Sequence, residues 1–147
     1  MKIVVDGDGC AGREVIEKVA KSKSIDVLIF CTINHMIRSD YSEVKIVDDG
    51  FQSVDMYVAN ATKNGDIVVT QDYGVAAMAL GRGALAISPK GNIYDNENID
   101  RLLFERHLHQ KNRRAGGRSK GSSKRKKEDD DRLAYNLDKL ILRSNGI

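Results

Sequence analysis

The amino-acid sequence predicts a single α/β domain of three layers (α/β/α) around a mostly parallel sheet of about five strands, with further helices toward the C-terminus. Its 147 residues are near the usual size of one domain. Short β-branched runs alternate with segments whose apolar residues recur at helical spacing, as in parallel βαβ units. We expect residues 1–114 to form the domain, 115–127 a flexible basic linker, and 128–147 a helix that docks on the domain.

The first half of the chain predicts three strands and two helices. Residues 26–31 (DVLIFC) are apolar almost throughout, as expected for a strand covered on both faces. Residues 34–43 are polar and irregular, which indicates a loop. Asn64-Gly65 is a typical end for the second helix. The expected strands are 2–5, 26–31 and 44–47, and the expected helices are 13–23 and 53–63.

The second half predicts two more strands and three helices. Residues 66–70 (DIVVT) are strongly β-branched. A stripe of Leu133, Leu137, Leu140 and Ile141 predicts that the last helix packs on the domain. Acidic residues open that helix, where they suit its dipole. The expected strands are 66–70 and 84–87, and the expected helices are 73–80, 98–114 and 128–147.

Composition excludes several classes of protein. No window approaches the run of about 18 apolar residues that a membrane span needs. The N-terminal run is too short for a signal peptide and is typical of a first strand. Two cysteines without a CxxC pair argue against a disulfide framework or a zinc knuckle. A reduced, cytoplasmic protein is expected. Cys10 is interpreted as a buried apolar residue rather than a thiol nucleophile.

Charge is distributed unevenly along the chain. Residues 106–127 contain ten of the 24 Lys and Arg residues and none of the 21 Asp and Glu residues. A basic arm on an acidic body indicates a polyanionic partner such as nucleic acid. A solvated, Lys-rich linker is the alternative interpretation. The side chains expected to contact nucleic acid are Arg113, Arg114, Arg118, Lys120, Lys124, Arg125, Lys126 and Lys127.

Aspartates follow several of the predicted strands. Asp6 and Asp8 follow the first, Asp48 and Asp49 the third, and Asp72 the fourth. The carboxyl ends of parallel strands meet at one edge of a sheet, where ligands bind. Carboxylates gathered there repel one another unless a cation neutralises them, and oxygen ligands favour Mg²⁺ or Mn²⁺. The sequence therefore predicts a divalent-metal site.

Some of these aspartates also have a plain structural interpretation. Asp often ends strands and caps helices, which fits Asp48 and Asp49 and is equally open for Asp72. Asp55 lies one turn inside the helix after the third strand, where a solvated residue is also expected. Asp26 and Asp66 precede strands, on the opposite edge, and are interpreted as structural.

Four segments together resemble the YaiI/YqxD family of uncharacterised bacterial proteins, placed among PIN-like nuclease folds. They are VDGDGC, SVDMYVAN, GDIVVTQDYGVAA and SPKGNIYDNENID. The resemblance extends over nearly the whole chain and implies a PIN-like fold with nuclease chemistry. The residues that it singles out are Asp6, Asp8, Cys10, Asn34, Arg38, Asp55, Thr70 and Asp72.

The sequence departs from the family pattern at a few positions. Gly7 and Gly9 replace alanines, Ala11 replaces a proline, and Gln52 stands where some members have Asp. Added glycines are expected to loosen the turn that aims Asp8. An acid missing at position 52 leaves one fewer metal ligand.

The leading hypothesis is a Mg²⁺- or Mn²⁺-dependent ribonuclease acting on RNA in preference to DNA. Its catalytic residues would be Asp6, Asp8, Asp55 and Asp72, of which Asp6, Asp55 and Asp72 bind metal. Supporting roles are expected for Cys10, Asn34, Arg38, Asp48 and Thr70.

Two alternatives stay open. In a phosphatase of the haloacid-dehalogenase type, Asp6 is the nucleophile, Asp8 the acid/base and Thr70 the phosphate-binding hydroxyl. The other alternative is a non-catalytic nucleic-acid-binding module on a PIN-like scaffold, because a fold does not by itself imply a function.

Overall fold

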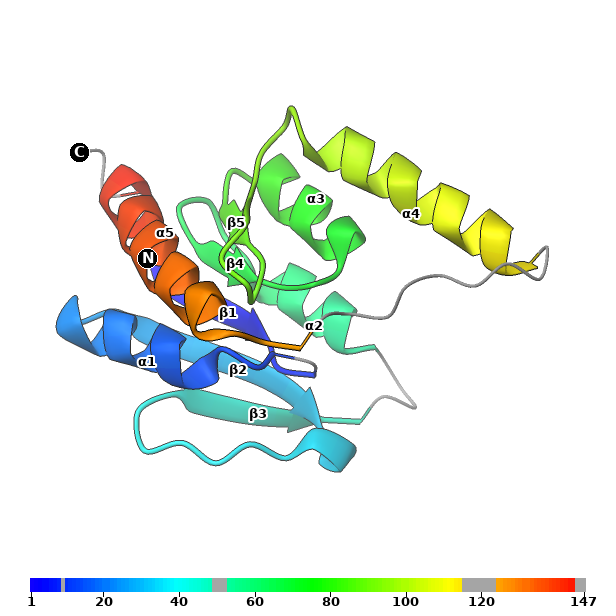
Figure 1. Cartoon of the computed structure of the whole chain (residues 1–147). Coiled ribbons are helices and arrows are strands. Elements are labelled where there is room, and N and C mark those ends of the chain that lie inside the picture. The colour runs from blue at the N-terminus through cyan, green and yellow to red at the C-terminus, as the bar shows by residue number, and fades with distance from the viewer. Residues whose placement is uncertain (9, 49–52, 115–123, 145–147) are drawn as a thin grey trace.

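A computed structural model describes residues 1–8, 10–48, 53–114 and 124–144. It contains a six-stranded sheet in the order β3-β2-β1-β4-β5-β6, with helices on both faces (Figure 1). Neighbouring strands are parallel except β5 and β6. The predicted, mostly parallel α/β sheet is therefore confirmed. The strands are β1 (Lys2–Asp6), β2 (Asp26–Thr32), β3 (Glu43–Val47), β4 (Ile67–Val69), β5 (Leu85–Ile87) and β6 (Ile93–Tyr94).

The helices agree with the predicted ranges to within two residues where the structure describes them. The predicted loop 34–43 begins with a single 3₁₀ turn, and β6 was not predicted at all. A two-residue strand is too short to show any periodicity. The helices are α1 (Arg13–Ser22), η1 (Ile33–His35), α2 (Val54–Ala61), α3 (Tyr73–Gly81), α4 (Ile99–Arg114) and α5 (Lys127–Ser144).

Alternation along the central strand separates two apolar cores. Ile3 and Val5 of β1 pack with the buried residues of α1 and α5 on one face of the sheet. Val4 packs with α2, α3 and the start of α4 on the other face. Successive side chains of a strand point to opposite faces, so the sheet is the middle layer of three. Asp6 shares the parity of Val4 and lies at the end of that series.

Helix α5 completes the first of these cores. Leu133, Leu137, Leu140 and Ile141 are all at most 1% exposed and pack against α1 and the sheet (Figure 1). Burial of such side chains stabilises the fold by roughly 1.5–3 kcal/mol each. The Asp129 carboxylate accepts a hydrogen bond from Lys126 N–H (2.9 Å) and so caps the start of the helix.

At the amino-terminal ends of the strands, opposite the ends that carry Asp6 and Asp72, Lys2 and Asp66 form a partly buried ion pair. The Asp66 side chain is 5% exposed and accepts hydrogen bonds from Lys2 Nζ (2.6 Å) and Lys63 N–H (2.9 Å). Asp66 thus ties the start of β1 to the turn before β4. Its role is structural, as the sequence predicts.

The strand order sets the place where a ligand can bind. Successive strands are added first on one side of β1 (β2, then β3) and afterwards on its other side (β4, then β5). The order in which strands are added therefore changes direction between β1 and β4. In open parallel sheets this switch point opens a crevice beyond the carboxyl ends of the strands. Asp6 and Thr70 lie there. Within the described ranges no helix is long and apolar enough to cross a membrane.

Candidate functional site

Two carboxylates lie where β1 ends: Asp6 is its last residue, and Asp8 lies in the tight turn that follows. Gly7 N–H donates a 2.7 Å hydrogen bond to Phe30 O, and a Cβ on Gly7 would lie 2.6 Å from that same oxygen. Thr32 N–H donates to Asp8 Oδ1 at 3.1 Å. Gly7 and Asp8 are therefore both hydrogen-bonded to backbone groups at the end of β2, which fixes the direction of Asp8. Gly9, the second glycine expected to loosen this turn, is outside the described residues.

Thr70 links the two strand ends that flank the switch point. It is fully buried, and its hydroxyl donates a hydrogen bond to Asp6 Oδ2 at 3.1 Å. The same hydroxyl oxygen accepts from Asp72 N–H at 3.0 Å, and the Thr70 carbonyl accepts from Tyr94 O–H at 3.1 Å. The side chain thus positions both Asp6 and the start of α3.

Asp72 is the N-cap of α3. Its Oδ1 accepts hydrogen bonds from Gly74 N–H (2.8 Å) and Val75 N–H (3.2 Å), and Arg106 Nη1 lies 3.5 Å from the same oxygen. The capping interpretation of Asp72 is right, but it does not exclude a second role. A carboxylate has two oxygens with several acceptor positions, so a cap can also be a ligand.

Three of the predicted carboxylates line one cavity of about 460 Å³. Asp6, Asp8 and Asp72 share its wall with Gln71, Tyr73 and Arg106.

Burial raises the pKa of Asp6 from 3.8 to about 6, against the lowering effect of the Thr70 hydrogen bond. The negative charges of Asp8, Asp72 and Asp55 raise the Asp6 pKa further. The structure thus brings the other three predicted carboxylates within electrostatic reach of Asp6, although Asp55 does not line the cavity.

The donors around Asp6 fit a hard divalent cation. They are oxygen atoms of carboxylates, and their mutual repulsion is of the kind that a cation relieves. In the part of the chain that the structure describes, no three side chains of His, Cys, Asp or Glu stand close enough to form a ready-made metal site. Binding would therefore require the carboxylates to draw together, which Asp6 and Asp55 can do without breaking a helix cap.

Other predicted supporting residues lie away from the cavity. Asp48 is exposed after β3, at the outer edge of the sheet, with β2 between it and β1. Asn34 and Arg38 are exposed in η1 and the loop that follows it. None of these three lines the cavity. Asp49, the second aspartate after the third strand, and Gln52, where some family members have Asp, are outside the described residues.

Cys10 belongs to the core rather than to the acidic site. It packs against the α1 and α5 side of the sheet, and burial raises the pKa of its thiol. A protonated thiol is a poor nucleophile, so the apolar interpretation of Cys10 is favoured. Both cysteines are free.

The basic arm is described only at its two ends. Arg118 and Lys120 lie outside the described residues, and Arg113 and Arg114 are described only as helical backbone of α4. Arg125 is engaged inside the fold: Nη1 donates to Pro89 O and Nε to Asp130 Oδ1, both at 2.8 Å, with the side chain 19% exposed. At the C-terminal end of the arm, the residues described as exposed are Lys124, Lys126 and Lys127.

The structure adds three residues to the cavity. Gln71 and Tyr73 flank Asp72 in the sequence, so their place in the cavity could have been predicted from that of Asp72. Arg106 lies 34 residues from Asp72 and reaches it only because α4 packs against α3. The sequence placed Arg106 in the basic arm without connecting it to the acidic edge.

Comparison with known proteins assigns the family. A family model described as "Uncharacterized BCR, YaiI/YqxD family" matches residues 4–143. The chain belongs to the YaiI/YqxD family. Among its relatives are a UPF0178 protein of Clostridium perfringens, 76% identical over all of this chain and 99% of the relative, and one of Clostridium tetani, 57% identical over 96% of this chain and 97% of the relative. The predicted family membership is confirmed.

One solved structure is more distantly similar to this YaiI/YqxD protein. It is Rae1 (YacP) from Bacillus subtilis, determined as a point mutant, with 18% sequence identity and a TM-score of 0.46. The similarity covers 79% of this chain and 84% of that one.

Proposed function

We propose that this YaiI/YqxD protein is a cytoplasmic ribonuclease that depends on Mg²⁺ or Mn²⁺. The observation that carries the proposal is the convergence of Asp6, Asp8 and Asp72 on one cavity at the switch point, where the charge of Asp55 also acts on Asp6. Gathering these carboxylates opposes ionisation of Asp6, so the arrangement is unfavourable for a purely structural role. The PIN-like nuclease placement of the family is consistent with the same use.

The proposed roles of the four carboxylates differ with their surroundings. Asp6, Asp55 and Asp72 would hold the ion directly or through water, and Asp8 would complete or orient the set from its anchored turn. When bound there, a divalent ion supplies positive charge that activates water and stabilises a phosphodiester in the transition state. Thr70 keeps Asp6 aimed at the cavity, and Asp6 is mostly ionised near neutral pH because its pKa is about 6.

Positive charge at the edge of the cavity suits a phosphodiester substrate. Arg106 lines the cavity beside Asp72, where its guanidinium can pair with a phosphate. At the C-terminal end of the basic arm, the structure describes three exposed lysines, Lys124, Lys126 and Lys127. Contacts from such an arm would add affinity independent of sequence.

The phosphatase alternative gains no support from the site. Its phosphate-binding hydroxyl would be Thr70, whose hydroxyl donates to Asp6 and accepts from Asp72 N–H instead. The alternative makes its own prediction, a phosphoaspartate that can be trapped on Asp6. The non-catalytic module predicts RNA binding that falls steeply with salt and ignores both chelators and Asp6→Asn.

The test compares cleavage by matched aspartate variants. Labelled single-stranded and structured RNA, with DNA of the same sequence, are incubated with Mn²⁺ and with wild type, Asp6→Asn or Asp26→Asn. Asp26 is exposed at the opposite end of the neighbouring strand and controls for loss of one carboxylate. We expect RNA cleavage by wild type and Asp26→Asn and none by Asp6→Asn. Cleavage that is absent in all three, or equal in all three, contradicts the proposal.

A further inference from the structure

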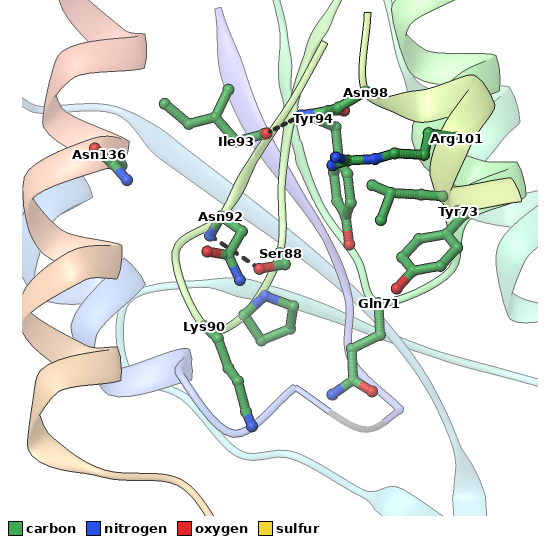
Figure 2. A pocket seen from close by; sticks show the side chains of 12 residues that line it. Gln71, Tyr73, Ser88, Lys90, Asn92, Ile93, Tyr94, Asn98, Arg101 and Asn136 are labelled. Atoms are coloured by element: carbon green, nitrogen blue, oxygen red, sulfur yellow. Dashed lines mark hydrogen bonds between the residues drawn. The ribbon is translucent and has the colours of Figure 1, made fainter. Parts of the chain in front are cut away.

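A second, larger pocket adjoins the acidic cavity. Its volume is about 700 Å³, and it shares Gln71 and Tyr73 with the acidic cavity. The remaining lining residues come from the turn at 88–92, from β6, from α4 and the residue before it, and from α5 (Figure 2). The two depressions therefore meet at the loop between β4 and α3. A molecule that binds with a phosphate in the acidic cavity can therefore extend its neighbouring groups into the second pocket.

The lining combines three kinds of group. Gln71 and Asn92 present amides, which both donate and accept hydrogen bonds. Tyr73 presents an aromatic ring, and Figure 2 shows Arg101 extending from α4 into the pocket opposite the turn that carries Lys90. Amides suit the polar edge of a nucleobase, an aromatic ring suits its face, and cations suit the adjoining phosphates.

Hydrogen bonds fix the walls of this pocket. In the turn, Asn92 N–H donates to Ser88 Oγ at 3.0 Å. Asn136 of α5 donates to Gly91 O at 2.7 Å, and Asn98 before α4 donates to Ile93 O at 3.0 Å. Tyr94 O–H is held by the Thr70 carbonyl. The pocket is thus formed by the fold itself, as small-molecule sites usually are.

We propose that this pocket binds one nucleotide next to the phosphate that is cleaved, so that the substrate is single-stranded. The inference rests on the proposed function for its choice of a nucleic acid. A volume of about 700 Å³ falls within the range of sites that enclose a small molecule. A base in a duplex is stacked on both faces and paired along one edge, so it cannot enter such a pocket without leaving the helix. An unpaired nucleotide can.

The test measures binding apart from cleavage. Fluorescence anisotropy follows a short labelled single-stranded RNA, and a duplex RNA of the same sequence, in EDTA. The pocket variant Asn92→Ala with Arg101→Gln is compared with Asn60→Ala with Arg82→Gln, which removes the same groups from exposed positions on α2 and at the end of α3. All four side chains are exposed, so the variants should fold, which thermal unfolding checks.

We expect the pocket variant to bind the single strand about 10-fold more weakly than wild type and the duplex equally well. The control pair should leave both affinities unchanged. Equal single-strand affinity in wild type and pocket variant overturns the inference, even where Mn²⁺-dependent cleavage is observed. Loss of single-strand binding in the pocket variant, with no cleavage by wild type, retains the pocket and rejects the proposed function.

Discussion

The Thr70 hydroxyl lies 3.1 Å from Asp6 Oδ2 and donates a hydrogen bond to it across the switch point of the sheet. The same oxygen accepts from Asp72 N–H, so one buried side chain connects the end of β1 with the cap of α3. Both carboxylates face the acidic cavity. Their relative position therefore depends on a hydroxyl that itself touches no substrate in the proposed reaction, which makes Thr70 a positioning residue.

Replacing Thr70 by valine should separate position from charge. Thr70→Val keeps the shape and removes both hydrogen bonds, so we expect the pKa of Asp6 to rise above about 6. Mn²⁺ affinity should fall by about 10-fold. Carboxyl titration by NMR and calorimetric Mn²⁺ binding measure the two effects. Thr70→Ser retains the hydroxyl and should restore both values. An unchanged Asp6 pKa in Thr70→Val shows that the hydroxyl does not act on Asp6.

The raised pKa of Asp6 predicts how metal-free stability depends on pH. Below pH 3.8 Asp6 is protonated in both the folded and the unfolded state, so its ionisation has no effect. Between pH 3.8 and about 6 the unfolded chain loses its proton first, and the fold becomes less stable as pH rises. Asp6→Asn stays neutral and can still accept from Thr70. In EDTA it should therefore exceed wild type by about 1–3 kcal/mol at pH 7.

Urea unfolding of the two proteins at pH 3.5 and pH 7 measures this difference. The advantage of Asp6→Asn should disappear at the lower pH, where Asp6 is neutral as well. Asp26→Asn, exposed at the opposite edge, should follow wild type at both values. A gap between Asp6→Asn and wild type that is the same at both pH values would mean that ionisation of Asp6 is not its cause.

The sequence predicted which aspartates lie at the candidate site wherever their position depends on the nearest strand alone. Asp6, Asp8 and Asp72 follow parallel strands, and strand polarity alone brings such residues to one edge. Strand order is a property of the whole sheet, so nothing in the sequence separated Asp48, beyond β2, from the aspartates at the centre.

The contact between Arg106 and Asp72 could not be predicted for a related reason. The spacing of apolar residues in α3 and α4 does not show that these two helices pack against each other. β6 is too short for a pattern to arise, yet the turn before it shapes the second pocket.

Arg125 should affect stability rather than nucleic-acid binding. Its guanidinium joins Pro89 O to Asp130 and packs over Gly12, where a Cβ would lie 2.9 Å from Nη2. Arg125→Ala leaves a partly buried carbonyl without its donor and should destabilise the fold by about 1–3 kcal/mol. Lys124→Ala, exposed next to it, should leave unfolding unchanged. Chemical unfolding measures both. Weaker RNA binding by Arg125→Ala at unaltered stability would instead assign Arg125 to the nucleic-acid surface.

Arg106 should affect metal and RNA in opposite directions. Its guanidinium lies 3.5 Å from Asp72 Oδ1, with the two side chains 44% and 34% exposed. An exposed pair of this kind adds little to stability, so Arg106→Gln should unfold within about 0.5 kcal/mol of wild type. Removing a positive charge that competes for Asp72 should tighten Mn²⁺ binding a few-fold. The same change removes a phosphate partner, so RNA affinity should fall and its salt slope should decrease by about one.

Calorimetric Mn²⁺ titration and RNA anisotropy across a salt series measure the two effects of Arg106→Gln. Arg143→Gln makes the same charge change at an exposed position in the last turn of α5, far along the chain from the cavity, and corrects for net charge. If Arg106→Gln weakens Mn²⁺ binding as well as RNA binding, Arg106 orients Asp72 for the metal instead of competing with it. If it alters neither relative to Arg143→Gln, the contact with Asp72 has no part in the site, and phosphate recognition there must come from the basic arm.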